Sequence, residues 1–362
     1  SGFSLLKSQY ILGGNKMKVM KNETKYERMQ QFITEQGQPN YRYKQIIDAL
    51  FKQRIGEFEK MVMLPKTLRN ELIKEFGENV LSVKPVLETS SQQVDKVLFE
   101  LSDNNRVEAV RMNYRAGWES FCISSQCGCG LSCKFCATGA IGLKKSLDVD
   151  EITDQLLYFY LKGHSLDSIS FMGMGEALAN PKIFSALNVL IDPKLFGLSP
   201  RRLTVSTVGI VPNIKRMTHT FPQVNLTFSL HSPFNSERSS LMPINDKFPL
   251  DKVMLTLDEH IRMTGRKVYI AYVMFRGVND SVDHAKAIVT LRQNRGRYEH
   301  LYHVNLIRYN PTVGAPEHYG QTDEQNIQMF YKELQSAGIH VTIRQQFGVD
   351  IDAACGQLYG QY

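Results

Sequence analysis

The chain has 362 residues, of which 43% are hydrophobic, so it can form one large domain or two to three smaller ones around a substantial core. No apolar run reaches the roughly 18–20 residues that a membrane-spanning helix needs. The formal net charge of +7 is moderately basic, which is compatible with a nucleic-acid partner and also common among other enzymes.

Residues 1–21 begin without a methionine and include Gly13-Gly14, so we interpret them as a leader or a remnant of cloning. Residues 22–115 are expected to form an accessory region that handles RNA. Its helices are predicted at 41–51, where the apolar residues share one face, and from Pro65 to the residue before Gly77. Their basic residues are also typical of ordinary solvated helix faces.

A β-hairpin is predicted after these helices, and the pattern then changes from residue 116 onwards. Strands at 94–101 and 107–114 alternate apolar and polar residues and flank a turn at 102–106. From there, short apolar strands alternate with amphipathic helices, which predicts a parallel sheet covered by helices. The strands are expected at 121–124, 168–172, 202–206, 224–230, 267–275, 301–307 and 340–344. The helices are expected at 148–163, after Pro181, and at 211–219, 250–263, 282–293 and 323–337.

Five of the six cysteines lie between residues 122 and 136, and the last three follow the spacing C-x3-C-x2-C as Cys129, Cys133 and Cys136. Thiolates at this density are typical metal ligands. Three of them on one tight loop indicate a [4Fe-4S] cluster with one iron that a small molecule can chelate. A zinc site completed by Cys127 and a disulfide cluster are the alternatives. Structural zinc usually takes two distant C-x2-C pairs, and we expect a reducing cytoplasm, where disulfides are rare.

Polar residues and glycines gather where several predicted strands end. Gly175 and Glu176 follow the strand at 168–172, and two glycines there allow a ligand to approach the backbone closely. In α/β barrels, functional groups lie at the carboxyl ends of strands and on the loops that follow. The other residues at such ends are Ser206, Ser229, Leu230, His231 and Asn310.

The cysteine loop and four further motifs, in this order, resemble the RlmN/Cfr family of adenosine methyltransferases within the radical S-adenosylmethionine (SAM) superfamily. The motifs are Cys-Ile-Ser-Ser-Gln-Cys-Gly-Cys (122–129), Phe-Met-Gly-Met-Gly-Glu (171–176), Ser-Leu-His (229–231), Asn-Leu-Ile-Arg-Tyr-Asn-Pro (305–311) and Asp-Ile-Asp-Ala-Ala-Cys-Gly-Gln-Leu (350–358). The resemblance runs from about residue 25 to the end of the chain.

The resemblance implies an α/β fold with an incomplete (β/α)6 radical SAM barrel over residues 116–310 and a C-terminal extension over 311–362. It implies a [4Fe-4S] cluster on the C-x3-C-x2-C cysteines, and SAM as the second cofactor. Two SAM molecules would be used per turnover, one as methyl donor and one as radical source. The residues implied to bind SAM are Gly175, Glu176, Ser206, Ser229, Leu230, His231 and Asn310.

Three further residues have roles that the resemblance implies. Cys355 would carry the methyl group as S-methylcysteine, Cys122 would form a disulfide with Cys355 to release the modified base, and Glu108 would accept the ring proton. A carrier thiolate makes chemical sense, because adenine C2 and C8 are not nucleophilic enough to attack a methyl sulfonium. Without the resemblance, Glu108 would be a solvent-facing strand residue, Cys355 an inert buried thiol and His231 a core histidine.

The substrate implied by the resemblance is an adenosine in the peptidyl transferase centre of 23S rRNA, free or in an immature large subunit. Whole-sequence likeness favours methylation of C8, with resistance to ribosome-targeting antibiotics as its consequence, over methylation of C2; tRNA is a possible second substrate. The other interpretations are a radical SAM activase of a protein partner and a zinc-stabilised RNA-binding protein. We expect a cytoplasmic monomer with no membrane partner that depends on an external electron donor.

Overall fold

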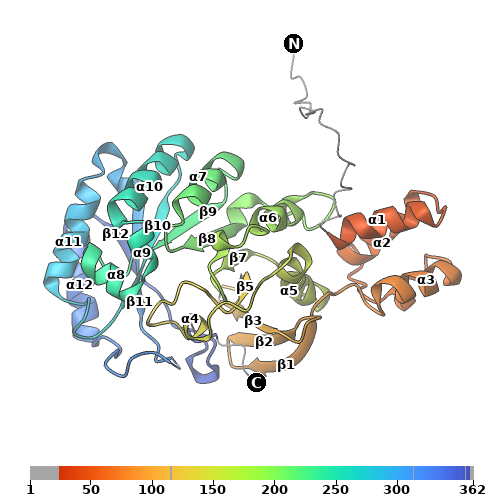
Figure 1. The fold of residues 1–362 in the computed structure, drawn as a ribbon, viewed down its shortest axis with the longest axis horizontal. Coiled ribbons are helices and arrows are strands. Elements are labelled where there is room, and N and C mark those ends of the chain that lie inside the picture. The colour runs from red at the N-terminus through yellow and green to blue at the C-terminus, as the bar shows by residue number, and fades with distance from the viewer. Residues whose placement is uncertain (1–23, 115, 313, 355, 359–362) are drawn as a thin grey trace, which may run out of the picture.

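The structure is a computed structural model that describes residues 24–114, 116–312, 314–354 and 356–358. Its centre is a ten-stranded sheet with the strand order β1-β2-β3-β4-β7-β8-β9-β10-β11-β12 (Figure 1). The predicted leader, residues 1–21, lies outside the described residues. None of the described helices combines the length and apolar character that a bilayer crossing requires.

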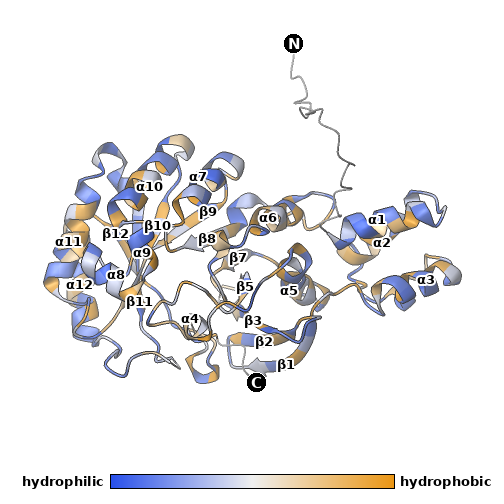
Figure 2. Cartoon of the chain, viewed as in Figure 1, coloured by the Kyte–Doolittle hydropathy of each residue, from blue (hydrophilic) through white to orange (hydrophobic). Residues whose placement is uncertain are grey.

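Seven consecutive strands of the sheet run parallel, which confirms the predicted partial barrel. They are β4 (Glu119–Cys122), β7 (Ser168–Phe171), β8 (Leu203–Thr207), β9 (Asn225–Ser229), β10 (Val268–Met274), β11 (Tyr302–Arg308) and β12 (His340–Ile343). The helices that connect them are α5 (Val149–Leu161), α6 (Ile183–Ile191), α7 (Val211–Thr220), α10 (Leu250–Thr264), α11 (Val282–Gln293) and α12 (Glu324–Ser336). These helices lie outside the strands (Figure 1), and Figure 2 shows both hydrophilic and hydrophobic residues along them.

Three antiparallel strands extend the same sheet at its other end. They are β1 (Lys84–Ser90), β2 (Val94–Glu100) and β3 (Arg106–Asn113), and β3 pairs antiparallel with β4. The β2–β3 hairpin was predicted. Strand β1 was not, because it lies at the edge with mostly exposed residues and therefore carries no alternation of apolar and polar positions. Strands β3 and β4, which lie on either side of the predicted boundary between residues 115 and 116, pair in one sheet. The predicted domain boundaries stay a prediction.

The N-terminal helices project from one end of the molecule (Figure 1). They are α1 (Lys25–Glu35), α2 (Tyr41–Phe51) and α3 (Lys66–Phe76), with the short helix η1 (Phe58–Lys60) between the last two. Gly77 ends α3 with φ +90, as its position predicts. Buried polar contacts tie this region to α5 of the barrel, since the amide of Lys25 donates to both carboxylate oxygens of Asp150 at 3.0 and 2.9 Å.

Several short elements lie in the connections between the strands and helices. They are β5 (Gln126–Cys127), β6 (Lys145–Ser146), α4 (Ala137–Ile141), α8 (Asn235–Leu241), α9 (Ile244–Lys247), η2 (Ala177–Ala179), η3 (Pro200–Arg202), η4 (Gly296–Leu301) and η5 (Val349–Ile351), and η3 and η4 directly precede β8 and β11. The sequence did not predict them, because two to seven residues are too few for a hydrophobic period to be recognised. The elements β5 and α4 flank the cysteine loop.

Candidate active site

The cysteine loop between β5 and α4 is held by backbone hydrogen bonds to distant parts of the chain. The amide of Cys129 donates to the oxygen of Gly142 at 3.2 Å, and the amide of Lys134 donates to the oxygen of Leu241 at 3.0 Å. Gly128 has φ +72, and a Cβ there would lie 1.8 Å from the oxygen of Gly142. Only glycine fits this position, so the loop has one narrow path.

The three thiols of the C-x3-C-x2-C sequence affect one another electrostatically. Burial raises the pKa of Cys129 to about 11; burial and the charges of Cys136 and Cys129 raise the pKa of Cys133 well above its usual range. Thiolates held this close need a cationic partner, and iron accepts such soft anionic ligands. The donor set therefore fits a [4Fe-4S] cluster, although no three described His, Cys, Asp or Glu side chains are arranged as a preformed metal-ion site.

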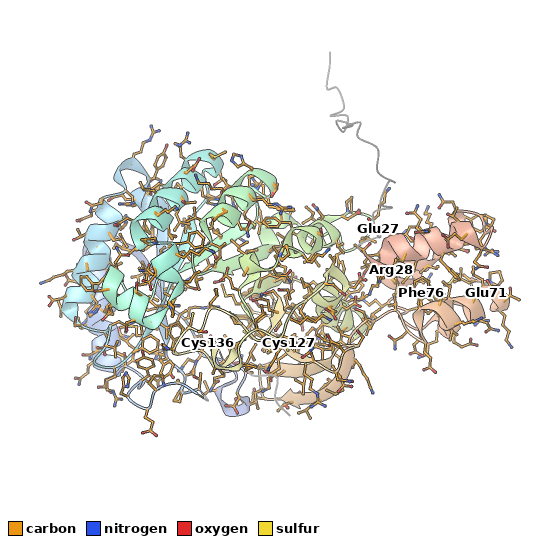
Figure 3. All side chains as sticks on the ribbon, viewed as in Figure 1. Glu27, Arg28, Glu71, Phe76, Cys127 and Cys136 are labelled. Carbon is orange, nitrogen blue, oxygen red and sulfur yellow. The ribbon has the colours of Figure 1, made fainter. Side chains whose placement is uncertain are left out.

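Cys127 is separate from these thiols. It is 6% exposed within the main hydrophobic core, and its Sγ lies 3.3 Å from the oxygen of Arg106 at the start of β3. Figure 3 shows it apart from Cys136. Cys127 therefore has a packing role, which argues against a zinc site completed by this residue.

The loop after β7 approaches the β4–β5 connection so closely that it requires two glycines. A Cβ on Gly173 would lie 2.7 Å from the carbonyl carbon and oxygen of Ile123. A Cβ on Gly175, whose φ is +94, would lie 2.9 Å from the backbone nitrogen of Gln126. The amide of Glu176 then donates to Oε1 of Gln126 at 2.9 Å. The glycines thus set Glu176 beside the strand that leads into the cysteine loop.

The carboxylate of Glu176 is buried and is held by backbone amides. It accepts hydrogen bonds from Val208 at 3.0 Å and from Leu178 at 3.2 Å. Burial raises the pKa of Glu176 to about 7, although these hydrogen bonds and one from Thr207 favour the ionised form. A ligand ammonium group nearby would stabilise the charged carboxylate, so Glu176 fits the predicted contact with the amino group of SAM.

His231 follows β9 with φ +57, which is uncommon for a residue other than glycine. Its Nδ1 accepts a hydrogen bond from the amide of Val273 at 3.0 Å. Burial, with a smaller effect from Arg238, lowers the pKa of His231 to about 3, so the ring is neutral and carries its proton on Nε2. The ring packs edge-on against Phe135 of the cysteine loop, with 5.0 Å between ring centroids. His231 is therefore a satisfied core histidine that also borders the predicted cofactor site.

Arg238 on α8 was not predicted, and it is completely buried. Its guanidinium donates to backbone oxygens at the ends of β8 and β9 and to one side chain: Val208 at 2.7 Å, Ser229 at 3.0 Å, Leu230 at 3.1 Å and Oδ1 of Asn245 at 2.6 Å. No carboxylate of the described residues forms an ion pair with it. Burial lowers the pKa of Arg238 to about 10, and the nearby charge of Cys133 opposes this effect. The guanidinium thus joins two strand ends next to the thiols.

A cavity of about 120 Å³ lies between the sheet and the C-terminal segment. Its walls include predicted site residues and their neighbours from six parts of the chain: Val110, Cys122, Cys136, Ser170, Gly173, Asn310, Ala354 and Gly356. The structure thus brings Cys122, Cys136 and Asn310 together. The predicted residues Glu176, Ser206, Ser229, Leu230 and His231 form a second group at the ends of β7, β8 and β9, outside this cavity wall.

The C-terminal segment docks on the cysteine loop. The amide of Ala137 donates to the oxygen of Gly356 at 3.0 Å, and Oγ1 of Thr138 donates to the oxygen of Leu358 at 2.7 Å. Cys355 lies outside the described residues, but Ala354 and Gly356 on either side of it line the cavity. The predicted disulfide between Cys122 and Cys355 therefore stays a prediction.

Glu108 on β3 is 1% exposed, so the interpretation of a solvent-facing strand carboxylate is wrong. Its Oε1 lies 3.1 Å from Nζ of Lys96 on β2. The sequence analysis did not identify Lys96 as a site residue. A signal was available, because Lys96 shares a face of the predicted strand with Val94 and Leu98 and is therefore expected to point inward. Arg238 carried no comparable signal, since α8 is too short to define an apolar face.

The fold and this site define a radical SAM enzyme. Residues 123–288 match the family model for the radical SAM superfamily, and residues 22–76 match the model for a ribosomal RNA large subunit methyltransferase N-terminal domain. The structure is similar to that of a radical SAM methyltransferase from Sphaerobacter thermophilus, with a TM-score of 0.87 and 35% sequence identity over 94% of this chain and 98% of that one.

Two relatives narrow this class to one family. The chain is 70% identical to the ribosomal RNA large subunit methyltransferase Cfr of Shouchella clausii, over 96% of this chain and 99% of the relative. It is 65% identical to the Cfr of Staphylococcus aureus, over 94% and 98% of the two chains. The chain belongs to the Cfr family of radical SAM ribosomal RNA methyltransferases. Family membership favours this activity over a protein activase or a zinc-stabilised RNA-binding protein.

Proposed function

We propose that the enzyme methylates C8 of an adenosine in the peptidyl transferase centre of 23S rRNA, free or in an immature large subunit, and thereby confers resistance to antibiotics that bind there. The high identity to Cfr proteins over nearly the whole chain supports this proposal. Methylation of C2 of the same adenosine, or of a tRNA, is the alternative. We further propose that the enzyme is a cytoplasmic monomer that receives electrons from an external donor.

The observation that carries the proposal is the composition of the cavity. Cys122 from β4, Cys136 from the cysteine loop and the two neighbours of Cys355 line one cavity, although about 220 residues separate Cys136 from Cys355 in the sequence (355 − 136 = 219). A target base must leave its stack to enter such a space, which costs a few kcal/mol and favours unpaired RNA. The same cavity would give a carrier thiol at position 355 access to the thiol of Cys122.

The chain's residues would divide the work as follows. Cys129, Cys133 and Cys136 would hold the cluster, which when bound supplies an open iron for SAM and an electron for its cleavage. Glu176 would accept hydrogen bonds from the SAM ammonium group. The residues after β7, β8, β9 and β11 would orient the rest of the cofactor: Gly175, Ser206, Ser229, Leu230, His231 and Asn310. Cys355 would hold the methyl group, Cys122 would release the product by disulfide formation, and the buried Glu108 would accept the ring proton.

Mass mapping of the modified nucleoside tests the proposal. Protein reconstituted anaerobically with iron and sulfide is expected to place one methyl group on C8 of an adenosine in a 23S rRNA fragment. The Cys355→Ala variant is expected to retain the iron and to form no methylated RNA. A product methylated only at C2 would contradict the C8 assignment, and methylated RNA from the alanine variant would contradict the carrier role.

A further inference from the structure

Lys96 and Glu108 form a buried ion pair on the inner face of the sheet. Nζ of Lys96 lies 3.1 Å from Oε1 of Glu108, and the two side chains are 4% and 1% exposed. Lys96 stands opposite Val110 in the β2–β3 ladder, and Glu108 stands two residues before Val110 on the same face of β3. Val110 lines the cavity, so the ion pair lies next to a residue of the cavity wall.

The same ammonium group also contacts the C-terminal segment. Nζ of Lys96 donates to the backbone oxygen of Asp352 at 3.3 Å, three residues before Cys355. Asp352 has φ +50, so its carbonyl is held in a conformation that few non-glycine residues adopt. Lys96 is therefore the point at which the predicted proton acceptor and the segment that carries the predicted methyl carrier meet.

Two packing contacts hold this segment against the same strands. The rings of Phe347 and Tyr114, at the end of β3, meet edge-on with 4.9 Å between their centroids. Gly348 packs against Val94 at the start of β2, since a Cβ on the glycine would lie 3.2 Å from Cγ1 of the valine. These apolar contacts fix where the segment crosses the sheet, and they would remain if the charge on Lys96 were removed.

Stability alone gives a weak reason for a buried lysine at this position. Transfer of an ammonium group and a carboxylate out of water is unfavourable, and a pair of apolar residues of similar volume is often as stable or more stable. A general base must be unprotonated to act, and a cation beside a carboxylate favours the charged form of that carboxylate. The ammonium group of Lys96 is therefore better explained by the chemistry of Glu108 than by a contribution to folding stability.

We propose that Lys96 is a positioning residue, whose ammonium group holds the carboxylate of Glu108 in place beside the segment that carries Cys355. The inference rests on the proposed roles of Glu108 and Cys355. It predicts that loss of the positive charge at residue 96 slows one of the two methyl transfers and leaves the other unchanged. The first, from SAM to the thiolate of Cys355, needs no acceptor for a ring proton, whereas the second, from the enzyme to the RNA, does.

The test compares Lys96→Met with the wild-type enzyme after iron and sulfide reconstitution. Peptide mass spectrometry reports the methyl group on Cys355, and nucleoside mass spectrometry reports the methyl group on the RNA. We expect Lys96→Met to methylate Cys355 normally and to methylate RNA roughly 10- to 100-fold more slowly, in kcat rather than KM, as expected for weakened general base catalysis. Lys96→Arg keeps the charge and is expected to recover part of the lost rate.

The matched control is Lys162→Met, which removes an exposed ion pair with Glu88 at 2.7 Å and is expected to leave both methylation steps unchanged. If Lys96→Met does not fold, Lys96→Gln replaces it, because glutamine loses the charge and keeps a hydrogen-bond donor. Wild-type RNA methylation in the uncharged variant would overturn the proposal. Equal loss of both methyl transfers, with no recovery in Lys96→Arg, would also overturn it.

The Glu108→Gln variant distinguishes this inference from the proposed function on which it rests. If Glu108→Gln loses RNA methylation while an uncharged residue 96 has no effect, only the role of Lys96 is wrong. If Glu108→Gln methylates RNA at the wild-type rate, Glu108 is not the proton acceptor and the proposed function itself must change.

Discussion

Gly175 combines a positive φ with a contact that leaves no room for a side chain. Its φ is +94, and a Cβ would meet the backbone nitrogen of Gln126 at 2.9 Å. We expect Gly175→Ala to lower the free energy of unfolding by about 2–4 kcal/mol, from backbone strain and from the steric overlap together. Chemical denaturation measures this loss.

The control for this variant is Gly265→Ala at the end of α10. Gly265 has a similar positive φ of +65, but nothing lies within 4 Å of an added Cβ. Gly265→Ala is therefore expected to lower the free energy of unfolding by only about 1–2 kcal/mol, from backbone strain alone. Equal losses in the two variants would mean that the loop after β7 can move away from Gln126.

The neutral ring of His231 makes folding stability depend on pH. The folded ring has a pKa of about 3 and the unfolded ring about 6.5, so below pH 6.5 the unfolded state binds the extra proton and stability falls as the pH drops. From pH 7 to pH 5 we expect a loss of about 2 kcal/mol from this residue. The free energy of unfolding is measured for the wild type and for His231→Asn at pH 7 and at pH 5. If the difference between the two proteins is the same at both pH values, the buried ring is not neutral.

The titration of Glu176 changes folding stability with pH in the opposite direction to that of His231. Its folded pKa of about 7 is above the unfolded value of 4.5, so the folded state takes up the proton first and gains stability as the pH falls from 7 towards 4.5. Glu176→Gln is therefore expected to make the loss of stability on acidification steeper, whereas His231→Asn makes it shallower. The two single variants separate these opposing contributions in the same denaturation series.

At the scale of elements, the junction between α1 and α5 joins the N-terminal helices to the barrel. Nζ of Lys25 forms an ion pair with Asp154 and donates to the oxygen of Val80 at 3.0 Å, and both charged side chains are almost completely buried. Lys25→Met leaves a buried carboxylate without its cation, and we expect a loss of about 3–5 kcal/mol in the free energy of unfolding. Thermal and chemical denaturation report this change.

Lys52→Met serves as the comparison on α2. Its ion pair with Asp48 spans 2.8 Å, but the lysine side chain is 69% exposed, so the pair contributes less than about 1 kcal/mol. A similar small effect in Lys25→Met would show that the junction rearranges to solvate Asp154, and the N-terminal helices would then be more independent of the barrel.

At the scale of the whole molecule, the C-terminal segment packs on the cysteine loop and covers it. It accepts hydrogen bonds from Ala137 and Thr138 directly after Cys136 and provides part of the cavity wall. Deletion of residues 348–362 is expected to leave the barrel helices folded and to expose the loop. Iron in the reconstituted protein should then be lost to a chelator several-fold faster than from the full chain, as followed by visible absorption. An unchanged rate of loss would contradict the closing role.

The sequence by itself determined the class of this protein. The alternation of short strands and amphipathic helices predicted the parallel part of the sheet, and the glycines and cysteines predicted the loops after β7 and β5. These signals are local, because hydrophobic periods, turn residues and ligand spacings are written into neighbouring residues.

Only the tertiary structure decided which residues from distant parts of the chain meet. In the structure, Lys96 lies between Glu108 and Asp352. Arg238 is buried among the carbonyl oxygens of two strand ends, and Cys127 lies in the hydrophobic core. The β2–β3 hairpin is also joined to the barrel in one sheet. Such contacts depend on the packing of residues that are far apart in sequence, and the type of a buried charged residue does not reveal its partner.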